Sequence, residues 1–215
     1  MSASENPASV PASGRDRLLE AAAAEFAESG YAGSSIAVIA ARACVSKSTV
    51  FHHFASKEEL YIAVIGNAVD DFGQRIDQAL TEEPTGQSAL KRFQLEHLKH
   101  LENHRQVARL ILRELQDPAL EGRKPLIMEL LSRNFARLVR HLEQQQGGGR
   151  LRADIDCQVA ALIMFAANAF YFQHADDLAQ LPEQGFRGDG RAFSSAVIDI
   201  LYNGLAPNAP DGDNA

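Results

Sequence analysis

The sequence contains little cysteine, since Cys44 and Cys157 are the only two among its 215 residues. They lie far apart and match neither a CxxC pair nor the Cys/His spacings of zinc sites. This pattern argues against a disulfide scaffold and against a structural zinc site. We interpret both as small buried residues or free thiols in a reducing compartment.

A long hydrophobic run is also missing. The longest one, residues 159–172, is interrupted by Asn168 and is shorter than the roughly 20 apolar residues that a membrane helix needs. The first residues, Met1 to Gly14, lack the basic start and apolar stretch of a secretory signal. We therefore expect a cytoplasmic protein with no membrane segment.

Positive charge is scarce, with 21 Lys and Arg against 28 Asp and Glu, for a net charge of −7. Even the segment before residue 60 holds more acidic than basic residues. A protein that binds nucleic acid needs lysine and arginine on the contacting face. If the protein binds DNA, its lysine and arginine residues must therefore be concentrated on a small part of the surface.

Strand signatures and internal repeats are absent, and apolar residues recur at helical spacing instead. We expect an all-α protein of about nine helices, with a hydrophobic content of 46% that is sufficient for a core. The expected helices cover approximately residues 15–30, 35–43, 46–54, 56–80, 85–101, 107–115, 122–146, 156–174 and 191–205.

The domain organisation follows from this pattern. We expect disordered tails at residues 1–13 and 206–215, a DNA-binding domain at 14–60 and a C-terminal helical bundle at 61–205. Leu181 to Gly190 is expected to form a polar loop.

Residues 35–54 predict a helix-turn-helix, in which two short helices joined by three or four residues present the second helix to a major groove. Ser35 and Ser46 are suitable N-caps. Apolar residues of both helices can turn inward onto Leu18 and Phe26, namely Ile36, Ile39, Ala40, Val45, Val50 and Phe54. The residues left outside suit contacts to phosphates and base edges. They are Ser46, Lys47, Ser48, Thr49, Phe51, His52 and His53.

At these residues the sequence resembles the tetracycline-repressor (TetR) family, over residues 14–62 and above all from Val45 to Leu60. The resemblance implies a three-helix DNA-binding domain followed by a helical domain for ligand binding and dimerisation. It further implies that Ser35 caps the second helix and touches phosphate. Residues at Lys47, Ser48, Thr49, His52 and His53 would face bases or phosphates, and Lys57 would bind the DNA backbone.

Two positions depart from the family pattern. Cys44 stands where the family usually has Gly, in a turn that often has positive φ, and a side chain there costs about 1 kcal/mol if that conformation is kept. Phe51 stands where the family often has Tyr, so the ring is kept and the hydroxyl that reaches a phosphate is lost.

Polar residues lie among apolar ones in the C-terminal helices and could orient an effector in a pocket. The candidates for effector binding are His97, Arg109, Arg113, Asn168, Tyr171 and His174; His100, His104 and Gln173 belong to the same polar set. Asn168 and Tyr171 rank first because they lie in the most apolar helix. Each residue could equally be a surface residue or a hydrogen-bonded core residue.

The helix at 156–174 is apolar on nearly every side and must be covered. We expect it to form a homodimer interface together with residues 191–205. The dimer would bind a palindromic operator in double-stranded DNA, and an unidentified small-molecule effector would release it. The resemblance favours repression over activation.

Other chemistries are less well supported. The adjacent His52 and His53 point about 100° apart on a helix, which disfavours a metal pair. Ser46 or Ser48 with a histidine lacks an orienting carboxylate, so we expect no catalytic residue, no metal and no cofactor. Two alternatives stay open. One is a small all-α enzyme or ligand carrier in which residues 35–55 are only structural, and the other is a regulator that senses through Cys44 or a protein partner.

Overall fold

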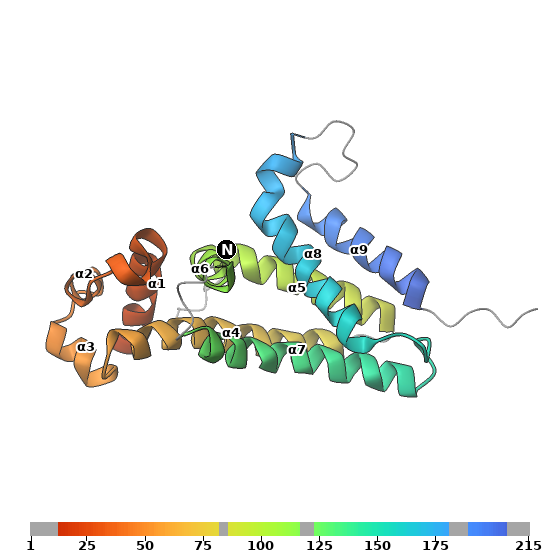
Figure 1. Ribbon diagram of the computed structural model, residues 1–215, viewed down its shortest axis with the longest axis horizontal. Helices are drawn as coiled ribbons and strands as arrows, with labels where there is room; N and C mark the ends of the chain where they lie inside the picture. The colour runs from red at the N-terminus through yellow and green to blue at the C-terminus, as the bar shows by residue number, and fades with distance from the viewer. Residues whose placement is uncertain (1–12, 82–85, 117–122, 181–188, 206–215) are drawn as a thin grey trace, which may run out of the picture. The chain divides into compact units, whose positions relative to one another are not determined.

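The computed structural model describes residues 13–81, 86–116, 123–180 and 189–205, which contain nine helices and no strand (Figure 1). This confirms the expected all-α class. The helices are α1 (Gly14–Gly33), α2 (Ile36–Arg42), α3 (Lys47–His53), α4 (Lys57–Thr81), α5 (Gly86–Asn103), α6 (Arg105–Gln116), α7 (Lys124–Gly147), α8 (Cys157–Leu178) and α9 (Gly190–Leu205). None of these described helices is long and apolar enough to cross a bilayer.

The chain divides into two compact units, Met1–Val64 and Ile65–Ala215, and α4 contributes residues to both. The expected tails at 1–13 and 206–215 lie outside the described residues, apart from Ser13, which caps α1. Residues 181–188 of the expected polar loop also lie outside them.

Helix starts follow the capping residues that the sequence offers. Ser35 Oγ accepts a hydrogen bond from the Ala37 amide at 3.2 Å, and Ser46 Oγ accepts one from the Thr49 amide at 3.1 Å. Asp156 caps α8, where its side chain accepts from the amides of Gln158 and Val159. Each side chain satisfies an amide that has no partner within the helix, which stabilises the start by about 1 kcal/mol.

Gly30 interrupts α1 where the sequence places a helix stop. Its φ of 70° and ψ of 173° are non-helical, and the α1 hydrogen-bond pattern resumes briefly as far as Gly33. Only glycine adopts this conformation without steric cost.

The first unit packs α1, α2, α3 and the start of α4 around one apolar core. Its largest fully buried side chains are Leu18, Phe26, Ile39, Leu60 and Tyr61. Of the residues expected to turn inward, Ile39, Ala40, Val50 and Phe54 are buried, while Ile36 and Val45 are half-buried. The inner face of α3 is therefore held by hydrophobic burial, which fixes what its other face presents.

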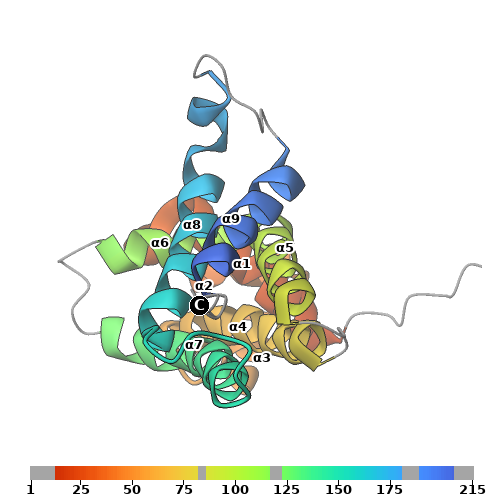
Figure 2. The same cartoon turned by 90° about the vertical axis from the view of Figure 1, so that its right-hand side faces the viewer.

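In the second unit, α4 lies beside α7, and α5 packs against α8 and α9 (Figures 1 and 2). Asn134 Nδ2 on α7 donates to the carbonyl of Val69 on α4 at 2.7 Å. Gly73 leaves room for the side chains of Arg137 and Asn134, because an added Cβ would lie 2.1 Å from Arg137 Nη1 and 2.9 Å from Asn134 Oδ1. The main core of the unit includes Phe72, Phe93, Leu138, Met164 and Ile198.

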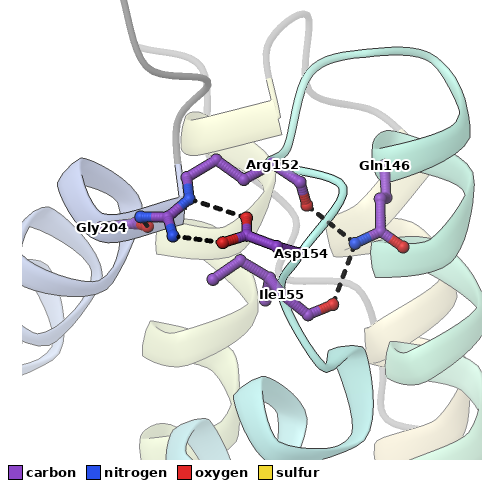
Figure 3. Close-up of polar contacts among 5 residues, drawn as sticks. All are labelled: Gln146, Arg152, Asp154, Ile155 and Gly204. Atoms are coloured by element: carbon purple, nitrogen blue, oxygen red, sulfur yellow. Dashed lines mark hydrogen bonds and ion pairs between the residues drawn. The ribbon is translucent and has the colours of Figure 1, made fainter.

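The connection from α7 to α8 is fixed by polar contacts (Figure 3). Gln146 Nε2 donates to the carbonyls of Arg152 at 2.8 Å and Ile155 at 2.9 Å. Arg152 pairs with Asp154 and donates through Nη1 to the carbonyl of Gly204 at 3.1 Å. The loop before α8 is thereby tied to the end of α9, which stabilises the pairing of these two helices.

Candidate DNA interface and ligand cavity

The outer face of α3 is exposed within its unit. Lys47, Ser48, His52 and His53 are exposed, and Phe51 keeps 53% of its surface accessible. Val50 is fully buried and anchors the opposite face. The short helix therefore offers a polar and aromatic surface on a fixed backbone, as recognition of base edges requires.

A hydroxyl cluster stands at the start of α3. Ser46 Oγ lies 2.7 Å from Ser48 Oγ and 2.9 Å from Thr49 Oγ1 while it caps the helix. Ser46 is thus committed to the helix start. Ser48 is exposed and Thr49 half-buried, and both hydroxyls can rotate toward another acceptor.

Lys57 is engaged within the protein. Its ammonium donates to the carbonyls of Tyr31 at 2.6 Å and Ser34 at 3.0 Å, and it lies 4.5 Å from the centre of the Tyr31 ring. These contacts tie the start of α4 to the end of α1. An ammonium has three N–H donors, so one is left for a phosphate. The expected contact of Lys57 with the DNA backbone stays a prediction.

Arg42 is also neutralised within the unit. Its guanidinium forms two hydrogen bonds to the Glu28 carboxylate and lies 3.5 Å from Glu25 Oε2. The hydrogen bond from Arg42 lowers the pKa of Glu28 below its ordinary value. Among the cations of residues 13–64, Lys47 is the one that forms no hydrogen bond, ion pair or ring contact. The free positive charge of α3 therefore comes from Lys47.

The interpretation of Cys44 as a buried residue is wrong, because its side chain is exposed. Cys44 has a φ of 54°, so the left-handed conformation that the family often has at this position is present. Its amide donates to the carbonyl of Ala41 at 3.1 Å, and the Val45 amide donates to that of Ala40 at 2.9 Å. This pair of bonds is the Schellman motif that ends many helices, and its left-handed residue is usually glycine. Cys157 is buried, as expected.

Ser35 serves first as a structural residue. It is half-buried, caps α2, and its amide donates to Glu25 Oε1 at 3.4 Å. Glu25 is itself buried, so this contact joins α1 to the start of α2. A phosphate contact of Ser35 stays a prediction.

The second unit contains a partly open cavity of about 470 Å³ that is lined by α4, α5, α6, α7 and α8. Most of the wall is aliphatic or aromatic, with Phe72, Phe135 and Phe165 among the lining residues. The polar lining residues are His97, His100, His104, Ser132 and Asn134. This volume and lining are typical of a site for an apolar small molecule with a few polar groups.

The candidate effector residues are distributed differently around this cavity. His97 lines it, and Asn168 contacts His97 without lining it. Tyr171 stacks on Phe193 with ring centres 4.4 Å apart. Arg109 and Arg113 are exposed on α6, and His174 lies 3.5 Å from Asp177. These last four residues do not line the cavity. His100 and His104, which belong to the wider polar set, do line the cavity, and so does Asn134, which lies outside that set.

His97 lies in a buried polar network. Asn168 Nδ2 donates to the carbonyl of Gln94 at 2.7 Å and lies 3.1 Å from His97 Nδ1. Gln94 Nε2 donates to the carbonyl of Met164 at 3.0 Å, which links α5 to α8. Burial, with a smaller contribution from His100, lowers the pKa of His97 to about 3. The cavity wall is therefore uncharged at this point at neutral pH.

Comparison with known proteins gives similarities in both units. Residues 18–64 match the model of the family described as bacterial regulatory proteins, tetR family. The fatty acid metabolism regulator protein of Bacillus subtilis (strain 168) is 24% identical over 189 residues, which cover 88% of this chain and 94% of that protein. The transcriptional regulator RutR of Escherichia coli (strain K12) is 29% identical over 197 residues, 88% of this chain and 89% of RutR.

A solved structure shows the same fold. The transcriptional regulator FadR from Bacillus subtilis in complex with stearoyl-CoA superposes with a TM-score of 0.72 at 23% identity. The match covers 87% of this chain and 97% of that one. The similarity of fold therefore extends well beyond the helix-turn-helix segment.

Proposed function

We propose that this chain, which belongs to the tetR family of bacterial regulatory proteins and is a DNA-binding transcriptional regulator, is a cytoplasmic repressor. It would bind a palindromic operator as a homodimer and be released by an apolar effector. The observation that carries the DNA-binding part is the exposed face of α3, from Lys47 to His53, on a helix anchored by the buried Val50. Two such helices in a dimer would enter major grooves about 34–36 Å apart.

Exposed apolar side chains support the homodimer. Val159, Ile163 and Phe170 on α8 keep 51%, 44% and 56% of their surface accessible. Their spacing of four and seven residues places them on one face of the helix. Ile200 on α9 is also exposed. A contiguous apolar face of this kind is typical of a subunit interface.

The cavity supports release by an effector. Its wall is largely apolar, so burial of hydrocarbon would provide most of the binding free energy. Stearoyl-CoA is the first probe to use, because the FadR structure with the same fold was determined with it. An effector lowers operator affinity only as far as it prefers the conformation that binds DNA poorly.

The test is binding of the purified chain to DNA that flanks its own coding region, at about 50 and 200 mM salt. We expect sequence-specific binding that weakens with salt and is released by stearoyl-CoA or another apolar probe. Ala169→Phe would place a ring inside the cavity. This variant should still bind the operator but should no longer be released from it by the apolar probe. Lys47→Ala should weaken binding and reduce the salt slope by about one.

The rival function is that of a small all-α enzyme or ligand carrier. A folded dimer that binds apolar probes in the cavity but no DNA at low salt would support the rival. The excess of acidic residues is the observation in its favour.

A further inference from the structure

Three potential metal ligands lie together in the second unit. His100 Nδ1 is 3.5 Å and His104 Nε2 is 3.4 Å from Asp71 Oδ2. All three ligand atoms lie within 4.8 Å of one another. Two ligands held at about 2.1 Å in a tetrahedral zinc site are separated by about 3.4 Å, so two of the three separations already fit.

The helices bring these residues together in a definite way. His100 and His104 are four residues apart, and the His104 amide donates to the His100 carbonyl at 2.9 Å, so one helical turn spans the junction of α5 and α6. Their rings therefore lie on the same face, with centres 4.4 Å apart. Asp71 comes from α4. The arrangement is the common one of two histidines one turn apart on a helix plus a carboxylate from elsewhere.

The state of His100 gives an independent indication of a ligand. The side chain is 8% exposed, and its Nδ1 makes no well-formed hydrogen bond within the described part of the chain, because Asp71 Oδ2 lies 3.5 Å away. Buried polar atoms are almost always satisfied, so a ring nitrogen held only by this long contact, beside a carboxylate and a second imidazole, indicates a place for another atom. Phe72 stacks on the ring, with centres 4.9 Å apart, and holds its orientation.

Arg75 holds the carboxylate of Asp71 in place. Arg75 Nε donates to Asp71 Oδ2 at 3.0 Å, so a metal would share that carboxylate with the guanidinium.

We propose that Asp71, His100 and His104 bind one divalent transition metal, with Zn²⁺ as the best fit, at the wall of the cavity. Imidazole with a carboxylate favours Zn²⁺ and its neighbours, whereas Mg²⁺ and Ca²⁺ prefer all-oxygen sites. Three protein ligands leave a fourth position for water or for an anionic group of a cavity ligand. His100 and His104 both line the cavity, so this position is accessible from it.

The experiment uses the full chain after removal of metal by a chelator, and it does not depend on DNA binding. Zn²⁺ is titrated calorimetrically, Co²⁺ is followed by its visible absorption, and Mg²⁺ serves as the control metal. We expect one Zn²⁺ per chain with micromolar or tighter affinity, tetrahedral Co²⁺ bands, and no heat from Mg²⁺. Asp71→Asn and His104→Gln should each weaken Zn²⁺ binding at least about 100-fold.

Two control variants separate this site from others. His174→Gln alters a half-exposed histidine on α8, which contributes no residue to the proposed site, and should leave Zn²⁺ binding unchanged. The double variant His52→Gln, His53→Gln tests the exposed pair on α3 and should also bind normally. Absence of saturable Zn²⁺ binding would overturn the proposal. So would normal binding by folded Asp71→Asn and His104→Gln proteins, as judged by circular dichroism, or loss of binding only in the α3 variant.

Discussion

Asn168 Nδ2 lies 3.1 Å from His97 Nδ1 and 2.7 Å from the carbonyl oxygen of Gln94. Because a backbone carbonyl can only accept, the Asn168 atom between these groups must be the amide nitrogen, which donates to both. His97 Nδ1 is then an acceptor, and the ring proton resides on Nε2. Protonation of Nδ1 would place two donors against each other in a buried site.

The first prediction concerns stability at acidic pH. Burial lowers the pKa of His97 to about 3 and that of His100 to about 4, whereas both titrate near 6.5 in the unfolded chain. The unfolded state therefore binds more protons below pH 6.5. The contribution of the two neutral histidines to the free energy of unfolding is therefore complete above pH 6.5. It is lost as the pH falls toward 4, by up to about 1.4 kcal/mol per pH unit for each histidine. Urea unfolding between pH 7.5 and 5 measures the effect.

His97→Gln is the matched variant, because it keeps an acceptor for Asn168 and removes the titration. Its unfolding free energy should depend on pH with a slope that is smaller by about one proton. An unchanged slope would show that His97 does not contribute to the pH dependence.

The local features of the fold could be predicted from the sequence, and the tertiary contacts of the candidate site could not. Ser35 and Ser46 cap their helices because a cap needs only residues within the next turn. Lys57 and Arg42 could not be assigned in this way. Their partners, Tyr31 and Glu28, lie 26 and 14 residues earlier, and their contacts depend on how α1 packs.

The cavity shows the same limit. Asn168 and Tyr171 rank first for effector binding because they lie in the most apolar helix, yet neither lines the cavity. Periodicity does not show which side of a covered helix faces a cavity. The spacing of His100 and His104 was visible in the sequence. Asp71 precedes them by about 30 residues, so only the packing of α4 against α5 and α6 reveals the cluster.

The second prediction concerns the turn before α3. Cys44→Gly should raise the free energy of unfolding by about 1 kcal/mol, because φ is 54° and glycine adopts this conformation without strain. Cys44→Ala keeps the Cβ and should give no such gain. Equal stability of the two variants in urea unfolding would contradict the strain. A gain from both would instead implicate the exposed thiol.

The third prediction concerns the hydrogen bonds of Lys57 at the start of α4. Lys57→Ala removes two charge-assisted hydrogen bonds to the carbonyls of Tyr31 and Ser34. It should lower the unfolding free energy by roughly 1–3 kcal/mol. Lys47→Ala, at an exposed position without partners, should change it by less than about 0.5 kcal/mol. If Lys57 also contacts phosphate, its variant weakens binding to all DNA sequences alike; a change of base preference would exclude that role.

The fourth prediction concerns base readout. His52 is exposed on the outer face of α3 and can donate to or accept from a base edge. His52→Ala should change the order of preference among operator variants by about 1–3 kcal/mol at the affected position. Competition binding against a set of single-base substitutions measures this order. Uniform weakening across the set would move His52 from base readout to phosphate contact.

The last prediction concerns the exposed apolar face of α8. Ile163 and Phe170 are exposed there, while the nearby Ala166 lines the cavity, so a charge at Ala166 would disturb two sites at once. Ile163→Glu and Phe170→Glu test the interface alone. If this face joins two subunits, each charge would be buried without a partner and should shift the protein from dimer to monomer in sedimentation velocity.

Leu126→Glu supplies the matched control, because Leu126 on α7 is an apolar residue of similar exposure, at 43% against 44% for Ile163. It should leave the dimer intact. Monomeric α8 variants that stay folded should also lose operator affinity, because a palindrome is bound by two recognition helices held together. A stable dimer of Phe170→Glu that still binds the operator would place the interface on another surface of the second unit.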